Sequence, residues 1–291
     1  MSRSWIVIAM IGAALWAGTA VAPRAALAQA AAPKMEGVKI DGEYGPFLPT
    51  DVSRDGHRID GLIDLLHYFM IALFVGWGIF FVYCLAKFRQ RPGRKADYEM
   101  VKAKPSKYAE IVVAIFEAVL LLGFSIPIWA SVKTPDPDPN PVKVRVIAEQ
   151  FAWNFHYPGK DGKFGKTAPK FINTATNPAG VDPSDPVGND DVVSGELHLP
   201  VNKSAMCEIT SKDVIHSFFI PVMRVKQDAV PGMRIPVWFH PVKTGTYEVA
   251  CAQLCGNNHY SMRALLFLQT ESDYNAWLEK KSAPAETFDE G

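Results

Sequence analysis

Two long apolar segments constrain this chain more than any other feature. They span Leu62–Leu85 and Ile111–Val132, and the only Asp, Glu, Lys or Arg residues within them are Asp64 and Glu117. Each segment is long enough to cross a bilayer as an α-helix. The sequence therefore predicts a transmembrane helical hairpin over residues 62–132. Two buried helices of a soluble protein are the alternative interpretation.

The loop that joins the two segments, residues 86–110, is strongly basic. Its stretch Lys87–Lys107 carries eight Lys or Arg residues against two acidic ones. Loops rich in Lys and Arg stay on the cytoplasmic side of a membrane. The hairpin is therefore expected to place residues 29–61 and 133–291 on the opposite, outer side.

Residues 1–28 have the pattern of a secretory signal peptide. Arg3 precedes the apolar stretch Trp5–Val21, and Ala26 and Ala28 form a small-residue cleavage site. We expect cleavage after Ala28. A membrane anchor is the alternative, because the apolar stretch is only marginally too short for one. No Cys lies at the cleavage junction itself, which argues against a lipid anchor.

From residue 133 onward the pattern changes to short runs bounded by Gly, Pro, Asn or Asp, as in β-sandwiches and barrels. The runs are Val142–Ile147, Phe151–Tyr157, Val192–Leu199, Met206–Ile209, Val237–His240, Thr246–Val249 and Ala264–Gln269. They predict an all-β domain over residues 133–291, with a short helix at Tyr274–Lys280. Residues 159–191 lack periodicity and are expected to form a surface insertion whose aspartates face solvent.

The charge balance and the cysteine content exclude some classes of protein. Lys and Arg number 30, and Asp and Glu also number 30. This neutrality argues against a nucleic-acid-binding protein. The part from residue 133 onward is mildly acidic, with sixteen basic and nineteen acidic residues. Four Cys are too few for a disulfide scaffold of this length.

A cluster of sulfur and imidazole groups lies near the C-terminus. Cys251, Cys255, His259 and Met262 fall within twelve residues, and His216 lies upstream where a strand is expected to end. Thiolate, thioether and imidazole together suit copper. A disulfide, a structural zinc site and ordinary core residues are the alternatives. Zinc leaves the Met unexplained, and the combined spacing favours copper.

The second Cys of the cluster indicates two metal ions rather than one. A mononuclear blue-copper site uses two His, one Cys and a weak axial Met, so this cluster has one thiolate too many. Two bridging sulfurs allow each copper one His and one weak ligand, and Gly256 permits the tight loop that they need. The unpaired electron is then shared by both metals, so the metal–ligand bonds are expected to change little on reduction.

From Leu62 to its C-terminus the chain resembles subunit II of the haem–copper cytochrome c oxidases. The most specific matches are Asp213–Phe218, Lys226–Gly232 and Cys251–Met262. The resemblance implies a transmembrane hairpin followed by a periplasmic cupredoxin-like Greek-key β-barrel that holds the dinuclear copper centre CuA. The implied metal ligands are His216, Cys251, Cys255, His259, Met262 and the backbone carbonyl of Gln253.

The resemblance also implies a function and partners. Subunit II accepts electrons from cytochrome c or another periplasmic donor and passes them to haem in subunit I, where oxygen is reduced to water and protons are pumped. The implied partners are subunits I and III and membrane lipid, with no nucleic acid. The implied location is a bacterial inner membrane, with two spans and the C-terminal domain on the periplasmic side.

Two positions depart from the usual family pattern. Gln253 stands where the family usually has a Glu that helps to bind magnesium, so its side chain is a candidate magnesium ligand without the charge. Phe151 stands where the family has an exposed Trp through which electrons enter, and Trp153 takes an inner position. Both aromatic residues are candidates for the point of electron uptake, and a core role is the alternative for Trp153.

Four acidic residues also have expected roles. Glu110 aligns with a family Glu at the mouth of a proton channel, and an interfacial carboxylate beside Lys107 is the alternative. Asp213 and Asp228 are candidates for docking a basic cytochrome c, with solvated loop charges as the alternative. For Glu117, inside the second apolar segment, we expect a polar partner in subunit I.

Other classes of protein fit the sequence less well. A membrane-tethered copper chaperone or thiol redox protein lacks the His and Met that follow the second Cys here. A quinol-oxidising relative has lost the copper ligands. A nitrous oxide reductase needs a much larger catalytic domain, whereas the copper subunit of a nitric oxide reductase remains open. The chain carries no C-x-x-C-H sequence for haem attachment.

Overall fold

The structure, a computed structural model, describes residues 38–42, 48–95, 98, 104–134 and 138–282. The predicted signal peptide, residues 1–28, lies outside these ranges.

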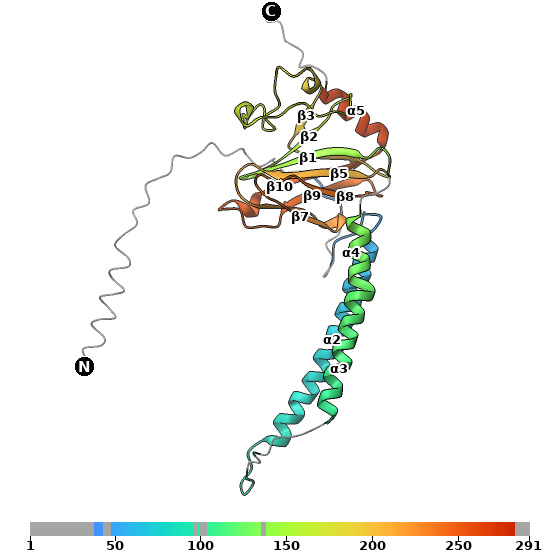
Figure 1. Ribbon diagram of the computed structural model, residues 1–291, viewed down its shortest axis with the longest axis vertical. Helices are drawn as coiled ribbons and strands as arrows, with labels where there is room; N and C mark the ends of the chain where they lie inside the picture. The colour runs from blue at the N-terminus through green and yellow to red at the C-terminus, as the bar shows by residue number, and fades with distance from the viewer. Residues whose placement is uncertain (1–37, 43–47, 96–97, 99–103, 135–137, 283–291) are drawn as a thin grey trace, which may run out of the picture. The chain divides into compact units, whose positions relative to one another are not determined.

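Two long helical spans form the N-terminal part of the described chain (Figure 1). The first is α2 (Gly56–Phe88), and the second comprises α3 (Lys104–Val119), a π-helical turn (Leu120–Ser125) and α4 (Ile126–Lys133). Both spans are long and apolar enough to cross a membrane, and almost none of their apolar surface is buried by this chain. Lipid or other protein is therefore needed to cover that surface.

The two helical spans run side by side. Each helical span is longer at both ends than the apolar segment predicted from the sequence. The rings of Phe69 and Phe116 lie 4.4 Å apart between their centroids, and Arg58 Nη1 donates to Ser131 Oγ at 3.3 Å. At about 1.5 Å per residue the 33 residues of α2 extend for roughly 50 Å. This length exceeds the hydrocarbon thickness of a bilayer, about 30 Å.

Pro127 accounts for the π-helical turn in the second span. Proline has no amide hydrogen and cannot donate to the carbonyl four residues earlier. Just before it, the Ile126 amide donates to the Leu121 carbonyl five residues back, which is the π-helical pattern. Ser125 Oγ donates to the Leu120 carbonyl at 3.2 Å. The helix therefore continues through the proline without a break.

The C-terminal part is a β-sandwich of two five-stranded sheets, in the orders β3-β2-β1-β5-β8 and β4-β10-β9-β6-β7 (Figure 1). The strands are β1 (Val142–Glu149), β2 (Ala152–Tyr157), β3 (Val192–Ser194), β4 (Leu197–Pro200), β5 (Ala205–Ser211), β6 (His216–Ile220), β7 (Val225–Ala229), β8 (Ile235–Phe239), β9 (Gly245–Cys251) and β10 (Arg263–Gln269). The predicted fold class, an apolar helical hairpin followed by an all-β domain, is confirmed.

The core lies between the two sheets. On β1 the alternate residues Val144 and Val146 are buried, as are Leu266 and Leu268 on β10. Strand β1 pairs with β5 in parallel and with β2 antiparallel, so both sheets contain mixed pairings. The terminal helix α5 (Glu271–Ser282) is longer at both ends than the predicted Tyr274–Lys280.

The prediction for the strand at His216 was wrong. This residue begins β6 instead of ending a strand, because the polar turn before it makes hydrogen bonds through Ser211 and Asp213. The predicted strand Val192–Leu199 is divided into β3 and β4, which belong to different sheets.

The expectation for the aspartates of the insertion was also wrong in part. Asp191 is buried against His156, and its carboxylate accepts from the Gly165 amide at 2.9 Å. Asp185 is also buried, and Asp190 accepts from two backbone amides of the insertion. These carboxylates hold the turns of the insertion together because they satisfy backbone donors that the loop leaves unpaired.

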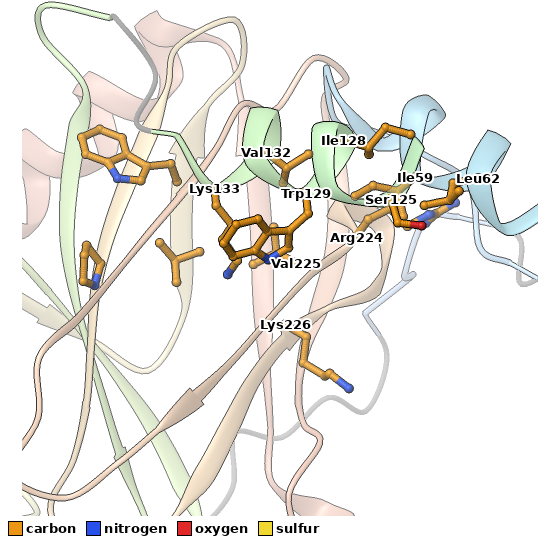
Figure 2. A pocket seen from close by; sticks show the side chains of 13 residues that line it. Ile59, Leu62, Ser125, Ile128, Trp129, Val132, Lys133, Arg224, Val225 and Lys226 are labelled. Carbon is orange, nitrogen blue, oxygen red and sulfur yellow. The ribbon is translucent and has the colours of Figure 1, made fainter. Parts of the chain in front are cut away.

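Arg224 ties the helices to the β domain. It lies in the turn between β6 and β7, and its Nε and Nη2 donate to the two oxygens of Asp60 on α2 at 2.6 and 2.8 Å. A cavity of about 290 Å³ lies at this junction, and Figure 2 shows Trp129 and Val132 of α4 on its wall near Val225 of β7. The paired guanidinium therefore fixes the start of α2 beside strand β7.

Candidate metal centre

Strand pairing brings the predicted ligands together. Cys251 ends β9, His216 begins β6, and β6 pairs with β9 so that Phe218 lies opposite Cys251. The loop after Cys251 returns to β10 through a short turn of 3-10 helix that begins at His259 and precedes Met262. Ligands that are 46 residues apart in the sequence, from 216 to 262, therefore gather at one end of the sandwich.

The two thiols lie close to each other and each has its own imidazole. The Sγ atoms of Cys251 and Cys255 are 3.9 Å apart. His216 Nδ1 lies 4.0 Å from the first sulfur, and His259 Nδ1 lies 3.6 Å from the second. A disulfide needs a separation of about 2.05 Å, and both cysteines are free. The structure therefore shows no disulfide between Cys251 and Cys255.

Two weaker donors complete the set. The carbonyl oxygen of Gln253 lies 3.2 Å from Cys251 Sγ, and Met262 Sδ lies 3.8 Å from Cys255 Sγ. The Met262 side chain is only 1% exposed, whereas Gln253 is exposed. Each sulfur thus has one imidazole and one weak donor beside it.

Gly256 allows the loop to fold tightly against the domain. Its φ is +143°, a region that residues with a Cβ rarely adopt. A Cβ there would come within 2.8 Å of Phe151 Cζ and 2.9 Å of Gln150 Nε2. The Gln150 amide group also donates to the Cys255 carbonyl. Phe151 therefore packs on the backbone of the metal-binding loop.

The indole ring of Trp153 packs against the imidazole ring of His216. The Trp153 side chain is 1% exposed, and its ring meets His216 edge-on with 6.3 Å between centroids and Phe218 with 5.7 Å. The structure thus places both aromatic candidates against the cluster, Phe151 partly buried and Trp153 fully buried.

Asp213 orients His216, a role that the sequence reasoning missed. Its carboxylate accepts from His216 Nε2 at 2.8 Å and from the amides of Gln150 and Val214, each at 2.6 Å. Because Nε2 is engaged, Nδ1 is the nitrogen presented to the sulfurs. The three-residue spacing Asp213-x-x-His216 was a signal in the sequence that a carboxylate could reach the ring.

The pKa of each group reflects this environment. Burial raises the pKa of Asp213, but hydrogen bonds from His216 and two amides outweigh it and lower the pKa overall. Burial lowers the pKa of His216, and the contacts with Cys251 and Asp213 outweigh it and raise the pKa. Burial also opposes ionisation of Cys251, yet hydrogen bonds with His216, His259 and the backbone of Ser217 and Gln253 lower its pKa to about 6. Burial and repulsion from that thiolate raise the pKa of Cys255 to about 12.

The remaining candidates lie elsewhere in the described chain. Asp228 is exposed on β7, where it lies opposite Ser217 of β6. Glu110 is exposed on α3 and accepts from Ser106 Oγ at 3.3 Å. Glu117 lies two turns further along the same helix and is exposed in the isolated chain.

The donor set fits copper. The ligand atoms of His216, Cys251 and Cys255 all lie within 4.8 Å of one another. Two thiolates and a thioether favour a soft metal, and the sulfur of Met262 would be unusual at zinc. The low pKa of Cys251 also favours metal binding, because the thiolate is the form that binds.

Comparisons with known proteins agree with this chemistry. Residues 142–267 match the family model described as cytochrome c oxidase subunit II, periplasmic domain. The alternative cytochrome c oxidase subunit 2 of Bradyrhizobium diazoefficiens is 35% identical over 240 residues, covering 82% of this chain and 85% of the relative. Cytochrome c oxidase subunit 2 of Cereibacter sphaeroides is 28% identical over 273 residues, covering 87% and 86%.

Among solved structures, the periplasmic domain of cytochrome oxidase subunit II from Bradyrhizobium japonicum aligns with a TM-score of 0.37 and 28% identity, over 50% of this chain and 96% of that domain. The family carries a copper centre, and its members are parts of an oxidoreductase complex embedded in a membrane. The long alignment with the Bradyrhizobium diazoefficiens relative, together with the family match, shows that this chain belongs to the cytochrome c oxidase subunit II family.

Proposed function

We propose that this chain takes up electrons for a terminal respiratory oxidase through a dinuclear copper centre of the CuA type. The observation that carries the proposal is the pair of free thiols 3.9 Å apart, each with one imidazole and one weak donor beside it. Cys251 and Cys255 would hold both metal ions through their thiolates, with His216 and His259 as the imidazole ligands. Met262 Sδ and the carbonyl of Gln253 complete the set.

The bound copper supplies reversible uptake and release of one electron. The residues of the chain hold its surroundings fixed during that change. Asp213 keeps the His216 ring in one orientation, and the burial of Met262 keeps water from that side of the cluster. A rigid ligand set lowers the reorganisation that each electron transfer requires.

Electrons arrive from cytochrome c or another periplasmic donor and leave to haem in subunit I, where oxygen is reduced to water and protons are pumped. Phe151 and Trp153, which both pack against the cluster, are the proposed path of uptake. The exposed carboxylate of Asp228 is the proposed docking group. Asp213 is a weaker docking candidate, since its carboxylate is engaged by His216.

The remaining roles follow the family pattern. Subunits I and III are the proposed partners in a bacterial inner membrane, with residues 133–291 on the periplasmic side and the connection between α2 and α3 in the cytoplasm. Glu110 is the proposed mouth of a proton channel into subunit I. The exposed side chain of Gln253 is the proposed magnesium ligand toward that subunit.

The proposal is tested in the assembled oxidase with a cysteine variant. Cys255→Ser removes one bridging sulfur and is expected to abolish oxidation of reduced cytochrome c, while the haem spectrum of subunit I stays unchanged. Cys84→Ser, in α2, is the matched control and is expected to retain activity. Full cytochrome c oxidation by Cys255→Ser would contradict the proposal, and consumption of nitric oxide in place of oxygen would favour the reductase alternative.

A further inference from the structure

A second cavity, whose lining includes none of the predicted copper ligands, lies between the outer face of one sheet and the insertion 159–191. Its volume is about 360 Å³, within the range of about 300–1,000 Å³ that is typical of small-molecule sites. Its floor is formed by β1, β2 and β5, and its other wall by the insertion, which is yellow-green in Figure 1.

Charged side chains form the floor of this cavity. They point away from the core because successive side chains along a strand alternate between the two faces of the sheet. On β1, Val144 and Val146 are buried, whereas Arg145 between them is on the outer face. The strand register places Arg145 beside His156 of β2 on one side and beside Glu208 of β5 on the other. Arg234, just before β8, also lines the cavity.

The cavity carries more positive than negative charge. Arg145 Nε lies 3.2 Å from Glu208 Oε1, and Arg234 Nη1 lies 2.8 Å from the same oxygen. Two guanidinium groups thus share one carboxylate oxygen. Lys212 also lines the cavity but is paired with Glu149 at 2.8 Å, so it adds no uncompensated charge.

Arg145 is held in place before any ligand arrives. Its guanidinium stacks over Phe164 of the insertion at 4.1 Å from the ring centroid, and Phe164 meets His156 edge-on at 5.0 Å. Asp191 fixes the imidazole ring of His156, with 2.6 Å between Asp191 Oδ2 and His156 Nε2. Despite its ion pair, Arg145 Nε is buried without a hydrogen bond. Burial lowers the pKa of Arg145 and repulsion from Arg234 adds to the effect, whereas attraction to Glu208 and Asp191 only partly opposes it.

Part of the remaining lining is apolar, and Thr167, Thr210 and Ser211 add hydroxyl groups. Ile172, Pro178 and Ala179 of the insertion face Ile147 of β1 across the cavity. A ligand that fits both surfaces has an anionic group on a compact apolar body, because a fully polar ligand would leave these side chains without matching contacts.

We propose that this cavity binds a small organic anion whose carboxylate or phosphate group is held by Arg145 and Arg234. A guanidinium binds either group through parallel hydrogen bonds. None of the proposed copper ligands lines this cavity. The anion-binding proposal can therefore be tested independently of the function proposed above.

The test is isothermal titration calorimetry on the full-length chain in detergent, with sodium hexanoate and inorganic phosphate in separate titrations. Binding of at least one probe is expected. Arg234→Gln removes one charged donor and is expected to weaken binding about tenfold. Glu208→Gln removes the competing carboxylate and is expected to strengthen binding at least about threefold.

Arg54→Gln is the matched control, because Arg54 is also an exposed arginine paired with one carboxylate. It is expected to leave binding unchanged. Binding of hexanoate alone would identify a carboxylate ligand, and binding of phosphate alone a phosphate ligand. Absence of binding by both probes, or equal affinity in Arg234→Gln and Arg54→Gln, would overturn the proposal.

Discussion

At the scale of single residues, the carboxylate of Asp213 decides which nitrogen of His216 faces the sulfurs. It is the acceptor for His216 Nε2 and for two backbone amides, and it lies in the polar turn that precedes β6. Mutation of a group that orients a metal-binding histidine in this way typically costs about 10- to 100-fold in metal affinity.

We therefore expect Asp213→Ala to weaken copper binding by about 10- to 100-fold, because the ring of His216 loses its anchor. Asp213→Asn is expected to recover part of this loss, since its amide oxygen still accepts from Nε2. Competition with a copper chelator measures both. Asp228→Asn, an exposed carboxylate on the neighbouring strand, is the control. Equal affinities for Asp213→Ala and Asp228→Asn would show that Asp213 does not orient the ligand.

The sequence predicted which sulfur and imidazole side chains gather in one cluster, whereas it did not predict the partners that support them. Sulfur and imidazole at short spacings identify Cys251, Cys255, His259 and Met262 because few other sites need that set. Nothing in the sequence near Gln150 indicates that its side chain reaches the Cys255 carbonyl, 105 residues away. Such contacts depend on strand pairing, which a local pattern does not contain.

At the scale of elements, helix α5 is attached to the sandwich by an aromatic stack around His198 of β4. The imidazole lies between the rings of Phe267 at 4.6 Å and Trp277 of α5 at 4.0 Å between centroids. Burial lowers the pKa of His198, and hydrogen bonds to Gln269 and Glu196 only partly oppose it. The neutral ring is therefore the form that this stack favours.

We expect α5 to loosen as the pH falls below the pKa of an unfolded histidine, about 6.5. Below that pH the unfolded chain binds a proton that folded His198 resists, so stability decreases with acidification. Hydrogen exchange of the α5 amides at neutral and mildly acidic pH measures the effect. His198→Gln, which cannot titrate, should lose this dependence, and an identical pH response in the variant would contradict the assignment.

The sequence analysis missed strands β6 and β7 for the same reason: neither shows the local alternation of apolar and polar residues by which a strand is recognised. In β6 four of five residues are buried, so the alternation that marks a half-buried strand is absent. In β7, an edge strand, Lys226, Gln227 and Asp228 are polar in succession. Only pairing with β6 shows that this segment is a strand. The apolar spans and the strands with clear alternation were predicted because their patterns are local.

At the scale of the whole molecule, the excess of acidic residues from position 133 onward bears on how a redox partner docks. A basic cytochrome c would be attracted to this domain, and salt weakens such attraction. We expect the rate of reduction by a basic cytochrome c to fall as ionic strength rises. Asp228→Asn should flatten that dependence, and stopped-flow spectroscopy measures both. A rate that does not respond to salt would exclude electrostatic docking.

The central claim is that two sulfur atoms of this chain bridge two copper ions that share one unpaired electron. The most direct measurement is a copper count on the purified full-length chain combined with its electron paramagnetic resonance spectrum. The account predicts two copper ions per chain and hyperfine splitting from two equivalent copper nuclei. A single copper ion with the electron localised on it, or a disulfide between Cys251 and Cys255 in place of metal, would contradict it.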